Sequence, residues 1–296
     1  FTENIAQRYE SYGWQVLQGS MYDYQQIESL VEEAKKDDRP SLIMLKSEIG
    51  KGAPTVVGKS AAHGAPLGDE GVKAAKEFLG LPVDKDFYVL PEAYEYFASK
   101  KDEIEKKYDA WQKDFEVWAS EEKELKALWD IMMSGNPLDV NETLPEYTTE
   151  DKLATRAASG AMLQVLEKMY PGLVGGSADL EGPNSCKIKS STYYAPDNRG
   201  GRNIHFGIRE FAMTAISNGM SLHGGLKPFC ATFLVFADYM KPAIRLSSLM
   251  KLPMIYIFTH DSIYVGEDGP THQPIETITS LRTIPGVQVL RPGDAQ

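Results

Sequence analysis

The sequence predicts an α/β protein with parallel sheets in two domains. Short, apolar, β-prone runs alternate with segments of helical spacing, and this alternation is typical of strands joined by crossover helices. The alternation is interrupted by the stretch from Asn136 to Thr149, which contains two prolines and scattered acids. The 296 residues suffice for one large or two ordinary domains, so we place the domain boundary in that stretch.

The composition excludes several classes of protein. A hydrophobic content of 42% with 25% charged residues is that of a globular protein, and no apolar run approaches the roughly 18 to 20 residues of a membrane span. The net charge of -11 argues against a broad nucleic-acid surface but leaves room for a local basic pocket. The two cysteines, Cys186 and Cys230, are too few for a disulfide framework. We therefore expect a cytoplasmic protein that binds neither nucleic acid nor membrane.

The first domain begins with a β-α-β unit. The strand predicted from Trp14 to Leu17 is followed by a helix from Tyr24 to Lys36 and a strand from Ser41 to Leu45. The polar, glycine-bearing loop from Glu48 to Leu67 contains His63 and is long for a mere connection, so we expect it to be functional or mobile. A short helix is predicted from Asp69 to Leu79.

A Lys/Glu-rich segment with spaced aromatic residues runs from Pro91 to Met133. One or two long amphipathic helices fit this pattern best. The aromatic side chains could form a core stripe or a base-stacking platform, and we expect them to be buried against a neighbouring element. They are Tyr94, Tyr96, Phe97, Tyr108, Trp111, Phe115 and Trp118.

The α/β alternation resumes in the second domain. The predicted strands are Leu173 to Val174, Asn203 to Phe206, Pro228 to Thr232, Met254 to Phe258 and Val287 to Leu290. The predicted helices are Asp151 to Tyr170, Glu210 to His223, Phe236 to Leu249 and Gln273 to Leu281.

The densest group of titratable residues follows the strand from Met254 to Phe258. Two histidines and three acids lie in the loop that continues to Pro274, where glycines and a proline constrain the backbone. In open α/β sheets, ligands bind outside the carboxyl ends of the strands. We therefore interpret this loop as part of a site, with an ordinary polar loop as the alternative.

Three other strand ends carry candidate residues, each with an ordinary structural explanation. The glycines of Gly175 to Leu180 allow either a tight turn or close approach of a ligand. Glu210 begins a helix, where the helix dipole stabilises an acid, yet a carboxylate in this apolar setting could also share a proton with a ligand nitrogen. Phe233, Phe236 and Tyr239 recur every three residues, which suits core packing or a stacking surface for a planar ring.

Metal and nucleotide motifs are absent from the sequence. The five histidines include no pair with HxxxH or HExxH spacing, and the cysteines form no CxxC pair. Neither a GxxxxGK[ST] phosphate loop nor a GxGxxG fingerprint occurs. We therefore predict no metal ligands within this chain.

Four motifs together resemble the transketolase family, whose members use thiamine diphosphate to transfer two-carbon ketol units. They are Gly-Gly-Ser-Ala-Asp-Leu, Gly-Ile-Arg-Glu, Thr-Phe-Leu-x-Phe and Thr-His-Asp-Ser-Ile-x-Val-Gly-Glu-Asp-Gly-Pro-Thr-His-Gln-Pro. Ala-Thr-Arg at 154 to 156 and Ala-His-Gly-Ala-Pro-Leu at 62 to 67 agree in order and spacing, so the resemblance covers nearly the whole chain.

The resemblance implies a parallel-sheet thiamine-diphosphate-binding fold, with an incomplete first domain and most of a second three-layer αβα domain. Residues 1–100 would be the C-terminal part of the diphosphate-binding domain, 101–149 a helical interdomain linker and 150–296 the pyrimidine-binding domain. Because the chain starts at Phe1 and ends at Gln296 just after a strand-like run, we expect it to be a piece of a longer protein. The divalent metal, Mg or Ca, would be bound upstream of Phe1, and the isolated piece would be inactive.

The resemblance also implies roles on the cofactor side. Glu210 would bond N1′ of the aminopyrimidine and favour its imino tautomer, whose nitrogen takes the proton from C2 of the thiazolium. Phe233, Phe236 and Tyr239 would form the pocket of the pyrimidine ring, and Asp179 would also contact the cofactor. The intact enzyme would be a homodimer.

On the substrate side, His63 and His272 would be proton carriers that face C2 and the sugar oxygens, with His63 also contacting the cofactor. Asp268 would bond a sugar hydroxyl. Arg156 and His260 would hold the phosphate of the sugar substrate. Ser185 is a plausible stand-in for a phosphate-contacting serine of the family, although the order here is Pro-Asn-Ser instead of Pro-Ser-Asn.

The implied reaction moves a ketol unit from xylulose 5-phosphate to ribose 5-phosphate or erythrose 4-phosphate in the pentose phosphate pathway. Three alternatives remain at this point: a non-catalytic assembly or regulatory module with the same fold, dihydroxyacetone synthase, and 1-deoxyxylulose-5-phosphate synthase. The first conflicts with the joint presence of His63, Glu210, Asp268 and His272. Arg156 and His260 favour transketolase over the two related enzymes.

Overall fold

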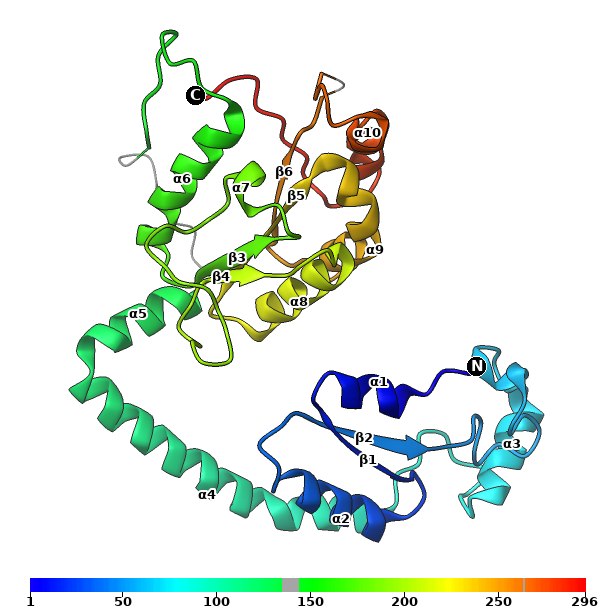
Figure 1. Ribbon diagram of the computed structural model, residues 1–296. Helices are drawn as coiled ribbons and strands as arrows, with labels where there is room; N and C mark the ends of the chain where they lie inside the picture. Colours follow the sequence, from blue (N-terminus) through cyan, green and yellow to red (C-terminus); the bar gives the residue numbers. More distant parts are fainter. Residues whose placement is uncertain (135–143, 263) are drawn as a thin grey trace. The chain divides into compact units, whose positions relative to one another are not determined.

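The computed structural model describes residues 1–134, 144–262 and 264–296 and divides into two compact units, Phe1–Asp109 and Ala110–Gln296 (Figure 1). Most of the predicted linker stretch from Asn136 onward, residues 136–143, lies outside the described residues. The finer division at 1–100, 101–149 and 150–296 therefore stays a prediction.

The first unit contains the predicted β-α-β arrangement. Strands β1 (Gln15–Ser20) and β2 (Ser41–Lys46) pair in parallel, and α2 (Tyr24–Ala34) connects them. α2 begins after Asp23, whose carboxylate accepts a hydrogen bond from the backbone N–H of Gln26 at 2.9 Å. This unit therefore confirms the predicted parallel pairing.

Three further elements complete the first unit. Helix α1 (Ile5–Ser11) was not predicted, although Asn4 caps its first turn. A short 3-10 turn, η1 (Ser60–His63), interrupts the long polar loop, and α3 (Gly68–Phe78) matches the predicted helix. The loop thus has local structure of its own, with His63 exposed at the end of the 3-10 turn.

The prediction that the aromatic residues of the Lys/Glu-rich segment are buried is wrong for most of them. The segment forms α4 (Pro91–Glu121) and α5 (Lys123–Ser134), as the spacing predicted. Phe115 and Trp118 are half-buried and contact Trp129 of α5, with ring centroids 5.7 and 6.3 Å away. The other aromatic side chains are 52% to 70% exposed; they are Tyr94, Tyr96, Phe97, Tyr108 and Trp111.

A four-stranded parallel sheet organises the second unit. Its strands are β3 (Leu173–Ser177), β4 (Asn203–His205), β5 (Lys227–Phe233) and β6 (Ile255–Thr259), in the order β4-β3-β5-β6. Apart from its half-buried first residue, β5 is buried, as expected for a strand at the centre of a parallel sheet with both faces covered.

Helices cover both faces of this sheet. On one face, α6 (Thr155–Met169) packs through Leu163 and Leu166 against Phe229 of β5. On the other face lie α8 (Glu210–His223), α9 (Ala237–Leu249) and α10 (Thr277–Arg282), and Met213 of α8 is in the same core as Cys230 of β5. The second unit is therefore a three-layer αβα domain, as predicted.

The last predicted strand, Val287 to Leu290, is not a strand in the structure. Val287 and Val289 are half-buried and pack against the core that includes Met240 and Ile244 of α9. The segment makes no strand pairing with any described part of the sheet. The prediction of a strand here is therefore wrong.

The two glycines after Val174 allow close strand packing, whereas the sequence alone indicates a tight turn or the close approach of a ligand. Both lie within β3, which extends to Ser177, so they form neither a turn nor a ligand loop. A Cβ atom on Gly176 would lie 2.0 Å from the carbonyl oxygen of Ile204 in β4, and one on Gly175 would lie 2.3 Å from that of Phe229. Glycine is thus required for the close approach of the neighbouring strands.

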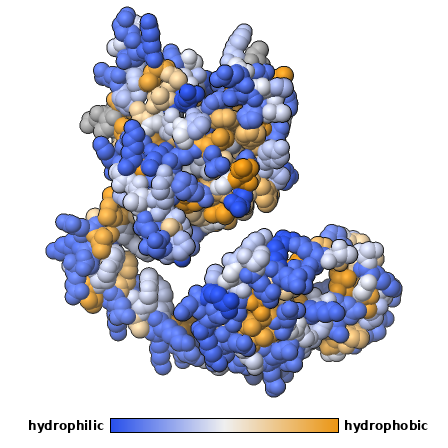
Figure 2. All heavy atoms as spheres, in the orientation of Figure 1, coloured by the Kyte–Doolittle hydropathy of each residue, from blue (hydrophilic) through white to orange (hydrophobic). Residues whose placement is uncertain are grey.

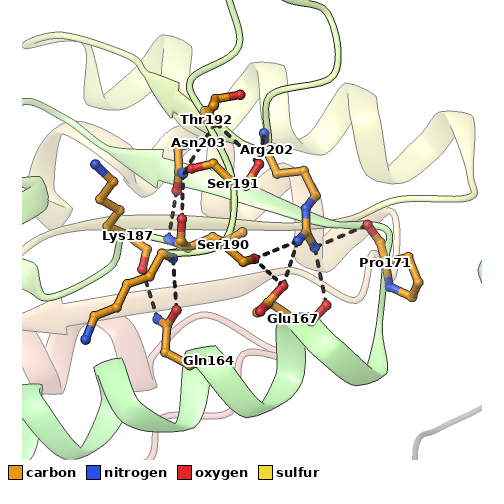
Figure 3. A network of polar contacts seen from close by, with 11 residues as sticks. Gln164, Glu167, Pro171, Lys187, Ser190, Ser191, Thr192, Arg202 and Asn203 are labelled. Atoms are coloured by element: carbon orange, nitrogen blue, oxygen red, sulfur yellow. Dashed lines mark hydrogen bonds and ion pairs between the residues drawn. The ribbon is translucent and has the colours of Figure 1, made fainter.

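The long connection between β3 and β4 is fixed by a polar network on α6 (Figure 3). Arg202 donates to the carboxylate of Glu167 at 2.6 Å, and the hydroxyl of Ser190 donates to the same oxygen at 2.8 Å. Burial alone would raise the pKa of Glu167, but these two hydrogen bonds and the positive charges of Arg202 and Lys168 together lower it below its ordinary value. The side chain of Asn203 also bonds both backbone groups of Ile188.

We expect the change Gly176→Ala to destabilise the second unit by about 3 kcal/mol or more, because the added methyl group would collide with the rigid backbone of β4. Thermal unfolding of the full-length protein measures the effect. The matched control is Gly219→Ala in α8, where a Cβ would meet no atom within 4 Å and should stabilise the helix by about 0.5 to 1 kcal/mol. Equal unfolding temperatures for Gly176→Ala and the wild type would contradict the strand packing described here.

Candidate functional site

Because the four strands of the second unit are parallel, their carboxyl ends share one edge of the sheet. β3 ends just before Asp179, β5 ends at Phe233, and β6 ends at Thr259, one residue before His260. β4 is followed by the turn that leads to Glu210, the first residue of α8. The candidate residues that the sequence placed at separate strand ends are thereby collected along a single edge.

Five of these residues form an aromatic cluster. The imidazole of His260 stacks on Phe233, with ring centroids 3.7 Å apart and an interplanar angle of 29°. His272 lies edge-on to Phe236 at 5.2 Å, and Tyr239 continues the row 6.3 Å from Phe236. Phe233 is buried, Phe236 is half-buried and Tyr239 is 64% exposed. The three-residue spacing therefore produces a graded surface, from a buried ring to an exposed one.

A pocket of about 510 Å³ lies next to His260. Its polar lining includes Arg156 and Ser159 of α6 and Asp261, and Arg291 donates to the carboxylate of Asp261 at 2.6 Å. Removal of the His260 imidazole from water lowers its pKa, and the positive charge of Arg156 lowers it further. The pocket thus combines a guanidinium group with an imidazole whose lowered pKa favours the neutral form.

The position of Glu210 is compatible with stabilisation by the helix dipole and with proton sharing with a ligand nitrogen. The residue is only 9% exposed, and it begins α8 with its carboxylate in the first turn, where the helix dipole stabilises negative charge. Its backbone carbonyl accepts a hydrogen bond from Thr214 at 2.9 Å. Geometry alone leaves both the dipole explanation and the proton-sharing explanation open.

The remaining predicted residues are Asp268, Asp179 and Ser185 of the second unit and His63 of the first unit. Asp268 is exposed, but its negative charge raises the pKa of His260 and so partly opposes the lowering effects. Asp179 is exposed in the loop after β3 and has a φ of 63°. Ser185 packs against Gly160 of α6 and is not among the described residues that line the pocket of His260.

Two residues of the site were missed by the sequence analysis. Asn184, at the end of the short helix α7 (Glu181–Asn184), donates to the hydroxyl of Thr259 at 2.7 Å, and that hydroxyl lies 2.9 Å from Nδ1 of His260. Asn184 is 1% exposed and Thr259 is 7% exposed. Thr259 could have been found from the sequence, because it is a polar residue directly before His260. Asn184 could not, because it lies 75 residues from Thr259 along the chain.

Metal ligands and membrane spans can be assessed only for the described ranges. Within residues 1–134, 144–262 and 264–296, no group of three or more His, Cys, Asp or Glu side chains could hold a metal ion. None of the helices in these ranges combines the length and the apolar character needed to cross a membrane.

Comparison with known proteins identifies the family. Residues 1–137 match the model of the transketolase thiamine diphosphate binding domain, and residues 151–296 match the model of the transketolase pyrimidine binding domain. The chain belongs to the transketolase family. Its parallel sheets and three-layer second unit are therefore those of the thiamine-diphosphate-binding fold of transketolases.

Individual transketolases match over the whole chain. The enzyme of Treponema pallidum is 51% identical and that of Geobacillus stearothermophilus 47% identical, and each match covers 100% of this chain and 45% of the relative. The crystal structure of Pichia stipitis transketolase in complex with sedoheptulose 7-phosphate matches with a TM-score of 0.92 and 37% identity over 100% of this chain and 45% of that chain. The chain thus spans less than half the length of these relatives.

We expect the change Arg156→Ala to raise the pKa of His260 towards that of a free imidazole, because it removes a positive charge that disfavours the imidazolium form. The change Asp268→Asn should lower that pKa, because it removes an opposing negative charge. A pH titration followed by histidine NMR measures both shifts, and the change His260→Gln assigns the signal. The exposed cation Arg282 of α10 provides the matched control, since Arg282→Ala should leave the titration unchanged. An unshifted pKa in Arg156→Ala would contradict the pocket geometry.

Proposed function

We propose that the full-length protein is a transketolase that moves a two-carbon ketol unit from xylulose 5-phosphate to ribose 5-phosphate or erythrose 4-phosphate in the pentose phosphate pathway. The observation that carries this proposal is the joint position of the aromatic cluster and the Arg156–His260 pocket at the carboxyl edge of one parallel sheet. The first feature suits a planar heteroaromatic ring and the second suits a phosphate group.

The residues of the second unit fit the pyrimidine half of thiamine diphosphate. Phe233 and Phe236 are nearly parallel, with an interplanar angle of 10°, and together with Tyr239 they offer a row of ring surfaces for stacking. Glu210 is a nearly buried carboxyl group that can share a proton with a ring nitrogen, and Asp179 lies in the loop after the neighbouring strand β3. When bound, the cofactor supplies the nucleophilic carbon for ketol transfer.

On the substrate side, we propose that Arg156 and His260 bind the sugar phosphate. Both side chains can donate hydrogen bonds, and a guanidinium group matches two phosphate oxygens at once. Asp268 would accept a hydrogen bond from a sugar hydroxyl, and His272 and His63 would carry protons to and from the sugar oxygens and the reacting carbon. Ser185 remains a weaker candidate for the phosphate, because Arg156 and His260 line the pocket and Ser185 does not line it within the described residues.

We further propose that the full-length protein is a cytoplasmic homodimer that binds Mg or Ca with its cofactor through residues outside this chain. Support for dimerisation comes from the exposed apolar side chains of α8 and the turn before it, Ile208, Phe211, Ile216 and Leu222. Apolar residues are visible over α8 and α9 in Figure 2. The free, buried thiols of Cys186 and Cys230 support a reducing compartment, and burial raises the pKa of each to about 12.

The change Glu210→Ala in the full-length protein tests the proposed function. We expect kcat for ketol transfer from xylulose 5-phosphate to ribose 5-phosphate to fall by about 10²- to 10⁴-fold, because the proton-sharing carboxylate is lost. Glu124 of α5 is also in the first turn of a helix but is exposed, so Glu124→Ala is the matched control and should keep full activity. If Glu210 only stabilises the helix dipole, Glu210→Ala would cost about 0.3 to 1 kcal/mol of stability and leave kcat unchanged. That result would overturn the assignment.

A further inference from the structure

A chain of hydrogen bonds runs from β3 through α7 to His260. The backbone N–H of Leu180 donates to the hydroxyl of Ser177 at 3.1 Å, and this hydroxyl donates to Oδ1 of Asn184 at 2.6 Å. Nδ2 of Asn184 donates to Oγ1 of Thr259 at 2.7 Å, and this oxygen lies 2.9 Å from Nδ1 of His260. Ser177, Asn184 and Thr259 are each less than 8% exposed. Thr259 and His260 both line the pocket, and His260 is the more exposed of the two.

The proton directions in this chain follow from the donor at one end and from the burial of the hydroxyl groups. A backbone N–H can only donate, so the Ser177 oxygen accepts from Leu180, and because Ser177 is buried its own proton needs an acceptor, which is Oδ1 of Asn184. The carbonyl oxygen of the Asn184 amide must then face Ser177, and its NH₂ group must face Thr259. Thr259 therefore accepts from Asn184. Because Thr259 is buried, its own proton needs an acceptor, and Nδ1 of His260 is in position to accept it.

We propose that Asn184 and Thr259 are positioning residues that hold His260 in the neutral tautomer with its proton on Nε2. In this tautomer Nδ1 is an acceptor and Nε2–H is a donor, so the ring offers a hydrogen bond to an anionic, acceptor-only group such as a phosphate. This inference rests on the proposed function for the identity of the ligand, but it rests on the geometry above for the tautomer.

Other contacts restrict the same ring and its backbone. Stacking on Phe233 fixes the ring plane. His260 itself has a φ of 54°, in the left-handed region that non-glycine residues rarely adopt, and such a conformation persists only where neighbouring contacts hold it. Thr259 bonds to Asn184 on one side, and Asp261 bonds to Arg291 on the other. The strained residue is therefore anchored at both of its chain neighbours.

The first test reads the tautomer directly in the full-length protein. Histidine labelled with ¹⁵N reports which ring nitrogen carries the proton, and His260→Gln assigns the signal. We expect the Nε2–H tautomer in the wild type, a loss of this preference in Thr259→Val, and its recovery in Thr259→Ser, which keeps the hydroxyl. Ser247→Ala is the control, because the Ser247 hydroxyl bonds to Tyr256 in the same unit and takes no part in the chain. A wild-type proton on Nδ1 would overturn the proposal.

The change Asn184→Asp tests the direction of the chain. A carboxylate in this place can only accept, so the Thr259 hydroxyl would donate its hydrogen bond to that carboxylate and its oxygen would be left as an acceptor towards His260. We expect His260 to move its proton to Nδ1 in this variant, although the side chain has nearly the same shape. An unchanged Nε2–H tautomer in Asn184→Asp would contradict the proton order that we infer.

Kinetics separate a positioning role from a general loss of structure. In Thr259→Val we expect KM for xylulose 5-phosphate to rise about tenfold, as the loss of one charge-assisted hydrogen bond predicts, with kcat nearly unchanged. KM for unphosphorylated xylulose should stay the same, and Thr259→Ser should restore the wild-type KM. An equal rise for both sugars would overturn the proposal. If the wild type has no ketol transferase activity but His260 carries its proton on Nε2, the proposed function fails and the tautomer assignment stands.

Discussion

The parallel pairing of β3, β5 and β6 is the constraint on which the site depends. It brings together residues that are far apart in the chain: Ser177 at the end of one strand and Thr259 at the end of another both reach Asn184. The two glycines inside β3 allow its neighbours to approach closely enough for this arrangement. A displacement of any of these strands would therefore alter the packing core, the aromatic cluster and the hydrogen-bond chain at the same time.

His260 lies between a buried hydrogen-bond network and the pocket that contains Arg156. Behind the ring is a chain of buried hydroxyl and amide groups, for which we infer the proton order given above. In front of it lies the pocket with Arg156, which favours the neutral imidazole through its positive charge. A neutral ring with a fixed donor can bind a phosphate without burying an additional positive charge beside the guanidinium, which reduces the cost of placing the two groups together.

Patterns of apolar residues were sufficient to predict the parallel sheets, most helices and the strand ends at which candidate residues lie. They failed where the outcome depends on distant partners. Val287 and Val289 alternate as in a strand, yet no described strand pairs with them, and α7 is too short and too rich in Gly and Pro to give a helical pattern. The family resemblance directed attention to Ser185, whereas its neighbour Asn184 makes the buried contacts with Ser177 and Thr259, because these contacts depend on strand register that no local pattern reveals.

The most direct test of this account is a crystal structure of the full-length protein with thiamine diphosphate and xylulose 5-phosphate. The account predicts that the sugar phosphate lies within hydrogen-bonding distance of the Arg156 guanidinium and of Nε2 of His260, while Nδ1 keeps its contact with Thr259. A phosphate bound elsewhere, or bound to Nδ1 of a rotated His260 ring, would contradict the account.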